Sequence, residues 1–197
     1  IVPANPAQGP ASIQGFYDAA LCVPEVIKEI QKHQNVDGIV IACFDDTGLD
    51  AIRSLVDVPV IGIGEAAFHA ASMLGTKFSV ITTLSRSVAG LEANLLRYGL
   101  AAKCGKVHAT DIPVLKLEES APHEVSLIRN AIGGAIEQDG ADTIVLGCAG
   151  MTDLADLLSQ EFGVPVVDGV VCAVTFVEAL IAAGFKTSKR GGYAYPL

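Results

Sequence analysis

Two kinds of segment alternate along the chain. Short apolar runs bounded by polar or glycine-containing turns are typical of strands buried on both faces of a parallel sheet. Longer segments repeat apolar residues every three or four positions, as helices packed on one side do. We expect strands at 38–42, 58–63, 78–83, within 141–148 and at 164–167. We expect helices at 17–33, 47–55, 65–74, from after Ser87 to 98, at 124–138, from after Cys148 to 162, and at 170–183. This alternation predicts an α/β fold with parallel sheets.

One stretch of the chain occurs twice. Residues 36–62 align with residues 141–168, and Asp37 then falls on Asp142. A single inserted residue brings Pro59 onto Pro165. The repeat predicts two pseudo-symmetric lobes, each with a parallel sheet flanked by helices. We expect the first lobe to hold 1–77 and 170–197, and the second to hold 78–169.

Each copy places a cysteine just past the carboxyl end of its strand, and Cys43 aligns with Cys148. Ligands bind at this edge of open α/β sheets. Helices starting near Asp46 and Met151 would point N–H groups at the sulfur atoms, so we expect thiols that ionise readily. A single cysteine here is more often a small buried apolar residue. Packing alone does not explain sulfur at both matched positions, which favours a functional pair.

Composition narrows the functional classes. The chain has 197 residues, of which 51% are hydrophobic, and this is ample for a core. Its net charge of −9 argues against nucleic-acid binding, which needs a basic surface. No apolar run is long enough to cross a membrane, and no signal peptide with a basic start is visible. We therefore expect a cytoplasmic protein, and we further expect a homo-oligomer.

The remaining cysteines and the histidines suggest no metal site and no disulfide framework. The five cysteines are scattered without CxxC spacing, which favours free thiols in a reducing compartment. The four histidines form no metal-binding pair of the HExxH kind. We expect neither a metal nor any other cofactor.

Two thiols facing each other across a cleft suit the chemistry of a racemase. One thiolate removes a proton from a carbon atom, and the opposite thiol returns a proton to the other face. Thiols suit this exchange because their pKa, near 8.5, is easily moved toward neutrality. Hydroxyl and backbone N–H groups nearby could stabilise the enolate-like oxygen that develops. The candidate catalytic residues are Cys43 and Cys148, and the candidate substrate-binding residues are Phe44, Thr47, Thr82, Thr83, Ala149, Gly150 and Met151.

Several motifs give the chain a family resemblance. They are Ala42-Cys-Phe-Asp-Asp-Thr-Gly-Leu49, Gly62-Ile-Gly-Glu-Ala66, Val80-Ile-Thr-Thr83, Gly147-Cys-Ala-Gly-Met151 and Lys189-Arg-Gly-Gly-Tyr193. With them the chain resembles the hydantoin racemase branch of the aspartate/glutamate racemase superfamily, which includes the allantoin racemases of purine catabolism. The resemblance implies a site between two lobes, Cys43 and Cys148 as the paired acid and base, and a 5-substituted hydantoin as substrate.

The start of the chain departs from this family. The Thr-rich strand end at Thr83 precedes Cys148 by 65 residues, and the same count back from Cys43 runs off the chain. The family opens with a strand ending in an Asn-Pro-Asn-Thr motif, which is absent here. We expect roughly 35 residues of the intact protein to precede Ile1, by the same repeat spacing.

Other functions stay open at this point. An arylmalonate-decarboxylase-like enzyme would need only the second cysteine, whereas a maleate isomerase uses two. A two-lobed binding module would close on a ligand without chemistry, and a cysteine hydrolase would need a histidine that no motif supplies. Among hydantoins, Phe44 would suit an alkyl or aryl substituent. The hydroxyls of Thr82, Thr83 and Ser85 would suit the ureido group of allantoin, and because polar sites discriminate more sharply we favour allantoin.

Overall fold

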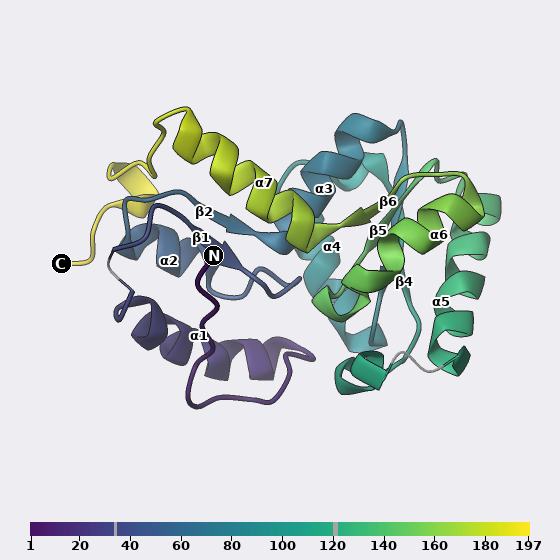
Figure 1. Ribbon diagram of the computed structural model, residues 1–197, viewed down its shortest axis with the longest axis horizontal. Helices are drawn as coiled ribbons and strands as arrows, with labels where there is room; N and C mark the ends of the chain where they lie inside the picture. Colours follow the sequence, from purple (N-terminus) through teal and green to yellow (C-terminus); the bar gives the residue numbers. More distant parts are fainter. Residues whose placement is uncertain (34, 120–121) are drawn as a thin grey trace.

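The computed structural model describes residues 1–33, 35–119 and 122–197, and it contains two parallel sheets (Figure 1). The smaller sheet pairs β1 (Ile39–Ile41) with β2 (Val60–Gly62). The larger has the order β4 (Cys104–Ala109), β3 (Phe78–Thr82), β5 (Thr143–Leu146) and β6 (Val166–Asp168). Neighbouring strands of the described residues pair in parallel in both sheets, which confirms the predicted α/β fold.

Helices connect the strands, and most lie close to the predicted ranges. The α-helices are α1 (Phe16–Ile30), α2 (Leu49–Leu55), α3 (Ile63–Leu74), α4 (Val88–Arg97), α5 (Pro122–Gly134), α6 (Ala155–Phe162) and α7 (Gly169–Ala182). A π-helical segment, Ala135–Asp139, continues α5. Short 3-10 helices lie at Ser85–Ser87, Ala101–Lys103, Val114–Glu119, Ala149–Leu154 and Gly191–Tyr193. Pro24 lies inside α1 without ending it.

The repeat in the sequence is also a repeat in strand register. In the smaller sheet Ile39 pairs with Val60, and Val40 pairs with Ile61. Their counterparts in the larger sheet, Ile144 and Val145, pair with Val166 and Val167. The two copies therefore form the same pair of parallel strands, and each pair delivers a cysteine-bearing loop at its carboxyl end.

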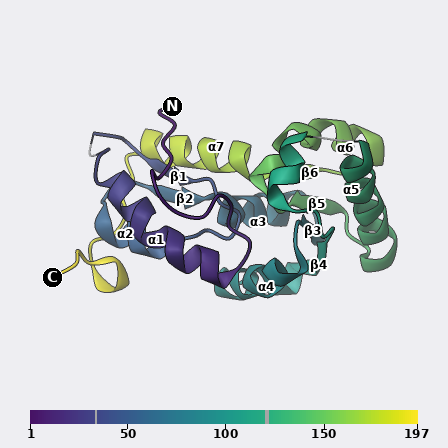
Figure 2. The same ribbon diagram turned by 90° about the horizontal axis from the view of Figure 1, so that it is seen from below.

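Each sheet is covered on both faces. One face of the larger sheet packs on α3 and α4, and the other packs on α5 and α6 (Figure 2). The smaller sheet packs on α1 and α2, and α7 contacts its other face. Burial on both faces explains why these strands lack alternating polar residues.

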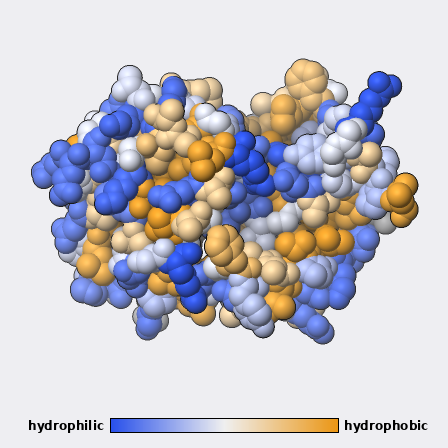
Figure 3. Space-filling model, turned by 180° about the vertical axis from the view of Figure 1, so that it is seen from behind, coloured by the Kyte–Doolittle hydropathy of each residue, from blue (hydrophilic) through white to orange (hydrophobic). Residues whose placement is uncertain are grey.

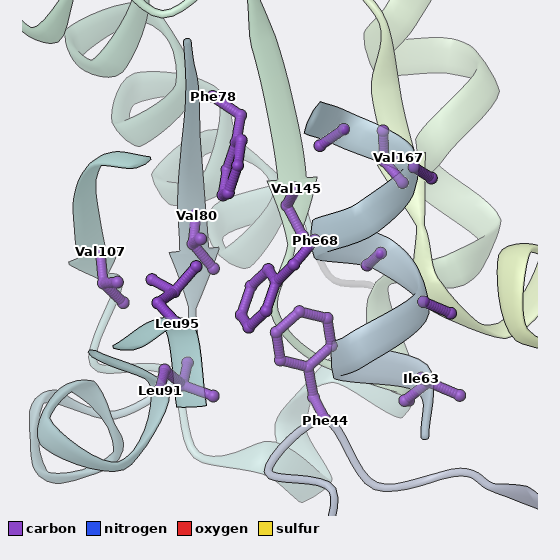
Figure 4. Packing of buried hydrophobic residues seen from close by; sticks show 14 of the residues in the cluster. Phe44, Ile63, Phe68, Phe78, Val80, Leu91, Leu95, Val107, Val145 and Val167 are labelled. Atoms are coloured by element: carbon purple, nitrogen blue, oxygen red, sulfur yellow. The ribbon is translucent and has the colours of Figure 1, made fainter. Parts of the chain in front are cut away.

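Helices α3 and α7 join the two sheets. They pack against each other, and α7 contacts β1, β2 and β6. Phe68 of α3 stacks on Phe78 of β3, with 6.0 Å between ring centroids (Figure 4). The helix that follows the smaller sheet therefore lies in the core of the larger one. The strands fall within 1–77 and 78–169 respectively, and the lobe boundaries themselves stay a prediction.

One detail of the predicted helices is wrong. The apolar pattern of α4 predicts Leu91, Leu95 and Leu96 on its inner face, but only Leu91 and Leu95 are buried, and Leu96 is 72% exposed. Consecutive residues in a helix point about 100° apart, and the buried stripe of α4 is too narrow to include Leu96.

Hydrophobic and hydrophilic side chains are interspersed on the face shown in Figure 3. Among the helices of the described residues, we find none that is both long and apolar enough to span a bilayer.

Candidate two-cysteine site

The Cys43 loop connects β1 to α2 and surrounds its thiol with hydrogen-bond donors. Cys43 Sγ lies 3.3 Å from Thr47 Oγ1. The backbone N–H groups of Asp45 and Thr47 also donate toward the sulfur. These donors favour a thiolate over a thiol, because a negatively charged sulfur accepts hydrogen bonds more strongly.

The Cys148 loop follows β5 and repeats part of this arrangement. The N–H of Gly150 donates toward Cys148 Sγ. Gly150 aligns with Asp45 in the repeat, so in both loops the N–H two residues after the cysteine is directed at the sulfur. The N–H of Met151 donates to the carbonyl oxygen of Cys148 at 3.1 Å and closes a tight turn. The second loop differs in its threonine, because the Thr152 hydroxyl donates to the Ala149 carbonyl at 2.8 Å, whereas that of Thr47 contacts the Cys43 sulfur.

The two loops meet at one hydrophobic cluster. Phe44, next to Cys43, is a buried member of the cluster that also contains Phe68 and Ile63 (Figure 4). Ala149, next to Cys148, packs against that same cluster. After burial, the negative charge of Asp45 also contributes to raising the pKa of both thiols.

The expectation of readily ionised thiols is wrong for this structure. Burial raises the pKa of Cys43 to about 11, and burial also raises the pKa of Cys148. The hydrogen bonds to sulfur lower both values but do not offset the loss of solvent. Helix α2 begins only at Leu49, so its first N–H groups lie further along the chain than we expected. Desolvation therefore outweighs the local donors.

Two hydroxyls of the cluster at the end of β3, those of Thr82 and Ser85, are already engaged within the protein. Thr82 Oγ1 donates to the carbonyl of Gly147, the residue before Cys148, at 3.2 Å. The Thr83 carbonyl accepts from the N–H of Asp111 at 2.7 Å. Ser85 donates through its N–H and its hydroxyl to the Asp111 carboxylate. The cluster thus braces the strand that lies beside the Cys148 loop.

The other predicted substrate-binding residues are distributed unevenly around the thiols. Phe44 is 5% exposed, and its ring meets that of Phe68 edge-on at 5.4 Å. Met151 is fully buried in the cluster on the opposite face of the larger sheet. Thr47 is buried beside Cys43, Ala149 is half-buried and Gly150 is exposed. The assignment of these residues to substrate stays a prediction.

A cavity of about 300 Å³ opens beside the Cys43 loop. It lies between α1, this loop and α4, and its lining includes Phe16, Asp45, Thr47 and Asn94. Asn94 donates to the Asp45 carbonyl at 3.0 Å and so fixes the loop against α4. Neither cysteine lines this cavity.

Sequence reasoning missed the carboxylates of the site. Burial raises the pKa of Asp45 and of Asp46 to about 6 in each case. The available signal was the pair of consecutive aspartates that follows Phe44, two and three residues after the candidate catalytic Cys43. Among residues 1–33, 35–119 and 122–197, no three His, Cys, Asp or Glu side chains are placed to hold a metal ion.

Comparison with known proteins identifies close relatives. The family model for Asp/Glu/Hydantoin racemase matches residues 1–177. The hydantoin racemase of Rhizobium meliloti is 50% identical over 194 residues, which cover 98% of this chain and 80% of that protein. The structure of allantoin racemase from Klebsiella pneumoniae matches with a TM-score of 0.94 at 44% identity, covering 97% of this chain and 79% of that one. The allantoin racemase AllR from Pseudomonas fluorescens matches with a TM-score of 0.95 at 38% identity, covering 99% of this chain and 83% of that one.

Proposed function

Because the chain belongs to the Asp/Glu/hydantoin racemase family, we propose that it racemises 5-substituted hydantoins by proton transfer at C5. In this proposal Cys43 and Cys148 are the two proton carriers. The observation that carries it is the convergence of the two cysteine loops on one cluster, each with an N–H directed at its sulfur. The relatives named hydantoin racemase and allantoin racemase support the same chemistry.

The reaction needs one proton carrier on each face of the ring. One cysteine, as thiolate, takes the proton from C5, and the electron pair left on carbon delocalises onto the C4 carbonyl oxygen. The planar enolate then receives a proton at C5 from the thiol on the opposite face. That second cysteine becomes the thiolate, and the product is the other enantiomer. The charge is conserved throughout, and the enzyme is ready for the reverse reaction.

The residues around sulfur would assist these two steps. The Thr47 hydroxyl and the N–H groups of Asp45 and Gly150 stabilise whichever thiolate is present. Since C5 is already acidified by its neighbouring carbonyl, the reaction requires no cofactor, and a chelator should leave the rate unchanged.

Replacing either cysteine tests the assignment. We expect Cys43→Ser and Cys148→Ser each to abolish racemisation of an optically pure hydantoin, followed as loss of optical rotation. In D₂O, one of the two variants should still exchange the C5 proton of a single enantiomer, because half of the mechanism survives. Cys22→Ser on α1 is the matched control and should racemise at the wild-type rate. Racemisation at near wild-type rate by both site variants would refute the two-base assignment.

We further propose allantoin as the preferred hydantoin. Phe44 packs in the core, so an apolar substituent would lack the ring that we expected to receive it. Thr82 is 1% exposed and its hydroxyl donates to Gly147, so the choice is supported instead by the two similar structures named allantoin racemase. Comparing kcat/KM for optically pure allantoin, 5-isopropylhydantoin and 5-benzylhydantoin is the measurement. A clear preference for either carbon-only substituent would contradict this choice.

A further inference from the structure

An aspartate carboxylate accepts hydrogen bonds from backbone N–H groups at the start of α3, and another does so at the start of α7. Asp46, in the Cys43 loop, accepts from the N–H of Gly64 at 2.9 Å and from that of Glu65 at 2.7 Å. Asp168, at the end of β6, accepts from the N–H of Val170 at 2.9 Å and from that of Val171 at 3.2 Å. These N–H groups occupy equivalent positions in the two copies, because Gly64 aligns with Val170.

The two aspartates themselves do not align. Asp46 falls on Met151, and Asp168 falls on Gly62. A Cβ atom placed on Gly62 would lie 2.0 Å from Asp46 Oδ1, so the carboxylate of Asp46 fills the space that a side chain at position 62 would take. The carboxylate that caps the helix therefore comes from the Cys43 loop in the first copy of the repeat and from the end of β6 in the second.

Each cap also holds a cysteine loop. Asp46 belongs to the Cys43 loop, so its two hydrogen bonds fix that loop directly on the first turn of α3. The contact is close, because a Cβ on Gly64 would meet the Phe44 carbonyl at 2.3 Å. In the second lobe the link is indirect: Thr152, of the Cys148 loop, lies with its Oγ1 3.1 Å from Asp168 Oδ1.

The two anchored helix ends lie against each other. A Cβ on Gly169, the first residue of α7, would lie 2.4 Å from the carbonyl oxygen of Ile63, the first residue of α3. Both loops are thus fixed to one central point, where the N-termini of α3 and α7 meet. Tyr98, the residue after α4, also holds the Asp46 carboxylate in place, because its hydroxyl donates to Asp46 Oδ2 at 2.7 Å.

We propose that Asp46 and Asp168 are positioning residues, which set the places of Cys43 and Cys148 by attaching their loops to the paired N-termini of α3 and α7. The proposal rests on the racemase function proposed above. It assigns Asp46 to the Cys43 half-reaction and Asp168 to the Cys148 half-reaction. Neither carboxylate is assigned any proton transfer to substrate.

Moving the cap within the first lobe is the sharpest test. Asp46 has a positive φ of 53°, which glycine adopts without strain, so Asp46→Gly removes the carboxylate and keeps the loop conformation accessible. We expect kcat to fall by about 10- to 100-fold, the effect of a misplacement near 1 Å. Adding Gly62→Asp should restore much of the loss, because the double variant reproduces the arrangement of Asp168. No gain of the double variant over Asp46→Gly, in folded protein, would overturn the proposal.

Milder variants keep the proposal testable if the double variant does not fold. Asp46→Asn retains one acceptor and should lose less activity than Asp46→Gly, and Tyr98→Phe should lose less still. Asp57→Asn, at a half-buried carboxylate that pairs with Lys186, and Tyr17→Phe, at an exposed ring, are matched controls and should behave as wild type. An Asp46→Asn enzyme with wild-type kcat and KM would contradict the assignment.

A paired readout separates positioning from general destabilisation. In D₂O, Asp46→Gly should slow C5 exchange of the enantiomer whose proton Cys43 removes, and Asp168→Asn should slow that of the enantiomer whose proton Cys148 removes. Equal slowing of both enantiomers by each variant would refute the pairing.

Alkylation distinguishes this proposal from the proposed function. Mapping iodoacetamide labelling should show a changed rate at Cys43 in Asp46→Gly and at Cys148 in Asp168→Asn, with the other site cysteine unchanged. This readout needs no substrate. If the wild-type enzyme exchanges no hydantoin proton, the proposed racemase function is wrong. The positioning roles of Asp46 and Asp168 are then tested by the labelling pattern alone.

Discussion

At the scale of single residues, burial and hydrogen bonding have opposite effects on the pKa of Cys43. Cys43 Sγ is close to a hydroxyl and two N–H groups, and yet burial raises its pKa to about 11. At neutral pH the substrate-free site therefore holds this cysteine mainly as a thiol. The proportion of Cys43 thiolate rises with pH, so we expect kcat/KM to increase from neutral toward alkaline pH.

Removing the charge of Asp45 tests how kcat/KM depends on pH. Burial raises the Asp45 pKa to about 6, so above that pH its carboxylate is ionised and disfavours both thiolates. Asp45→Asn removes the charge, and we expect the alkaline rise of kcat/KM to move to lower pH by less than about one unit. Below about pH 6 the charge is absent in the wild type as well, so the electrostatic difference should vanish. Profiles from pH 5 to 11, with Asp57→Asn as control, measure the shift, and a shift to higher pH would contradict it.

At the scale of secondary-structure elements, one carboxylate holds the starts of β3 and β5 together. Asp142 accepts from the Thr76 hydroxyl at 2.6 Å and from the N–H groups of Thr76 and Lys77. A Cβ on Gly75 would lie 2.1 Å from Asp142 Oδ1, so the turn into β3 requires glycine at this close approach. The bond from the Thr76 side chain is the main reason that the Asp142 pKa falls to about 2.

This lowered pKa predicts an acid-dependent contribution to stability. The folded value lies below the unfolded value of about 3.9, so the contribution is fully present above pH 4 and is lost as pH falls toward 2. We expect Asp142→Asn to lower the melting temperature at pH 5 to 7, with the gap from wild type narrowing between pH 4 and 2. Asp37→Asn, at the exposed counterpart in the repeat, is the control. A gap that does not change with pH would show that the charge is not responsible.

At the scale of the whole molecule, the last residues return to α2 and to the segment that follows it. Thr187 donates through its N–H to the Asp57 carbonyl at 2.8 Å and through its hydroxyl to the Val58 carbonyl at 2.7 Å. Lys189 Nζ donates to the Arg53 carbonyl at 2.6 Å and lies 4.6 Å from the centroid of the Tyr195 ring. These contacts attach the segment after α7 to α2 and to the connection between α2 and β2, so the tail stabilises the smaller sheet from outside.

Removing the lysine should release this tail without altering the chemistry. We expect Lys189→Met to make the bonds after residue 189 more accessible to limited proteolysis, while kcat stays within about twofold of wild type because no site residue is touched. Mass spectrometry of the fragments identifies the cleavage sites, and Lys103→Met is the control on another lysine that bonds a carbonyl. Unchanged proteolysis in the variant would show that the lysine contributes little to holding the tail.

The sequence by itself determined β1, β2, β3, β5 and β6, their parallel direction and the place of both cysteines, but it did not predict β4, the edge strand of the larger sheet. Buried parallel strands are continuous apolar runs, and the alignment of Cys43 with Cys148 carries over directly to the shared register of the two strand pairs. Local pattern was sufficient because each of these features depends on neighbouring residues. Helix boundaries were within about two residues for α2 and α3 for the same reason.

The tertiary structure decided what surrounds those residues. Phe44 entered the core because α3 brings Phe68 against it, and the thiol pKa values rose because packed segments from elsewhere exclude water. Asp46 caps α3, a helix that begins 17 residues further along the chain at Ile63. Its carboxylate occupies the space that a side chain at position 62 would need, so that position is glycine. Burial, desolvation and close approach depend on segments distant in sequence, and a linear pattern does not state which segments meet.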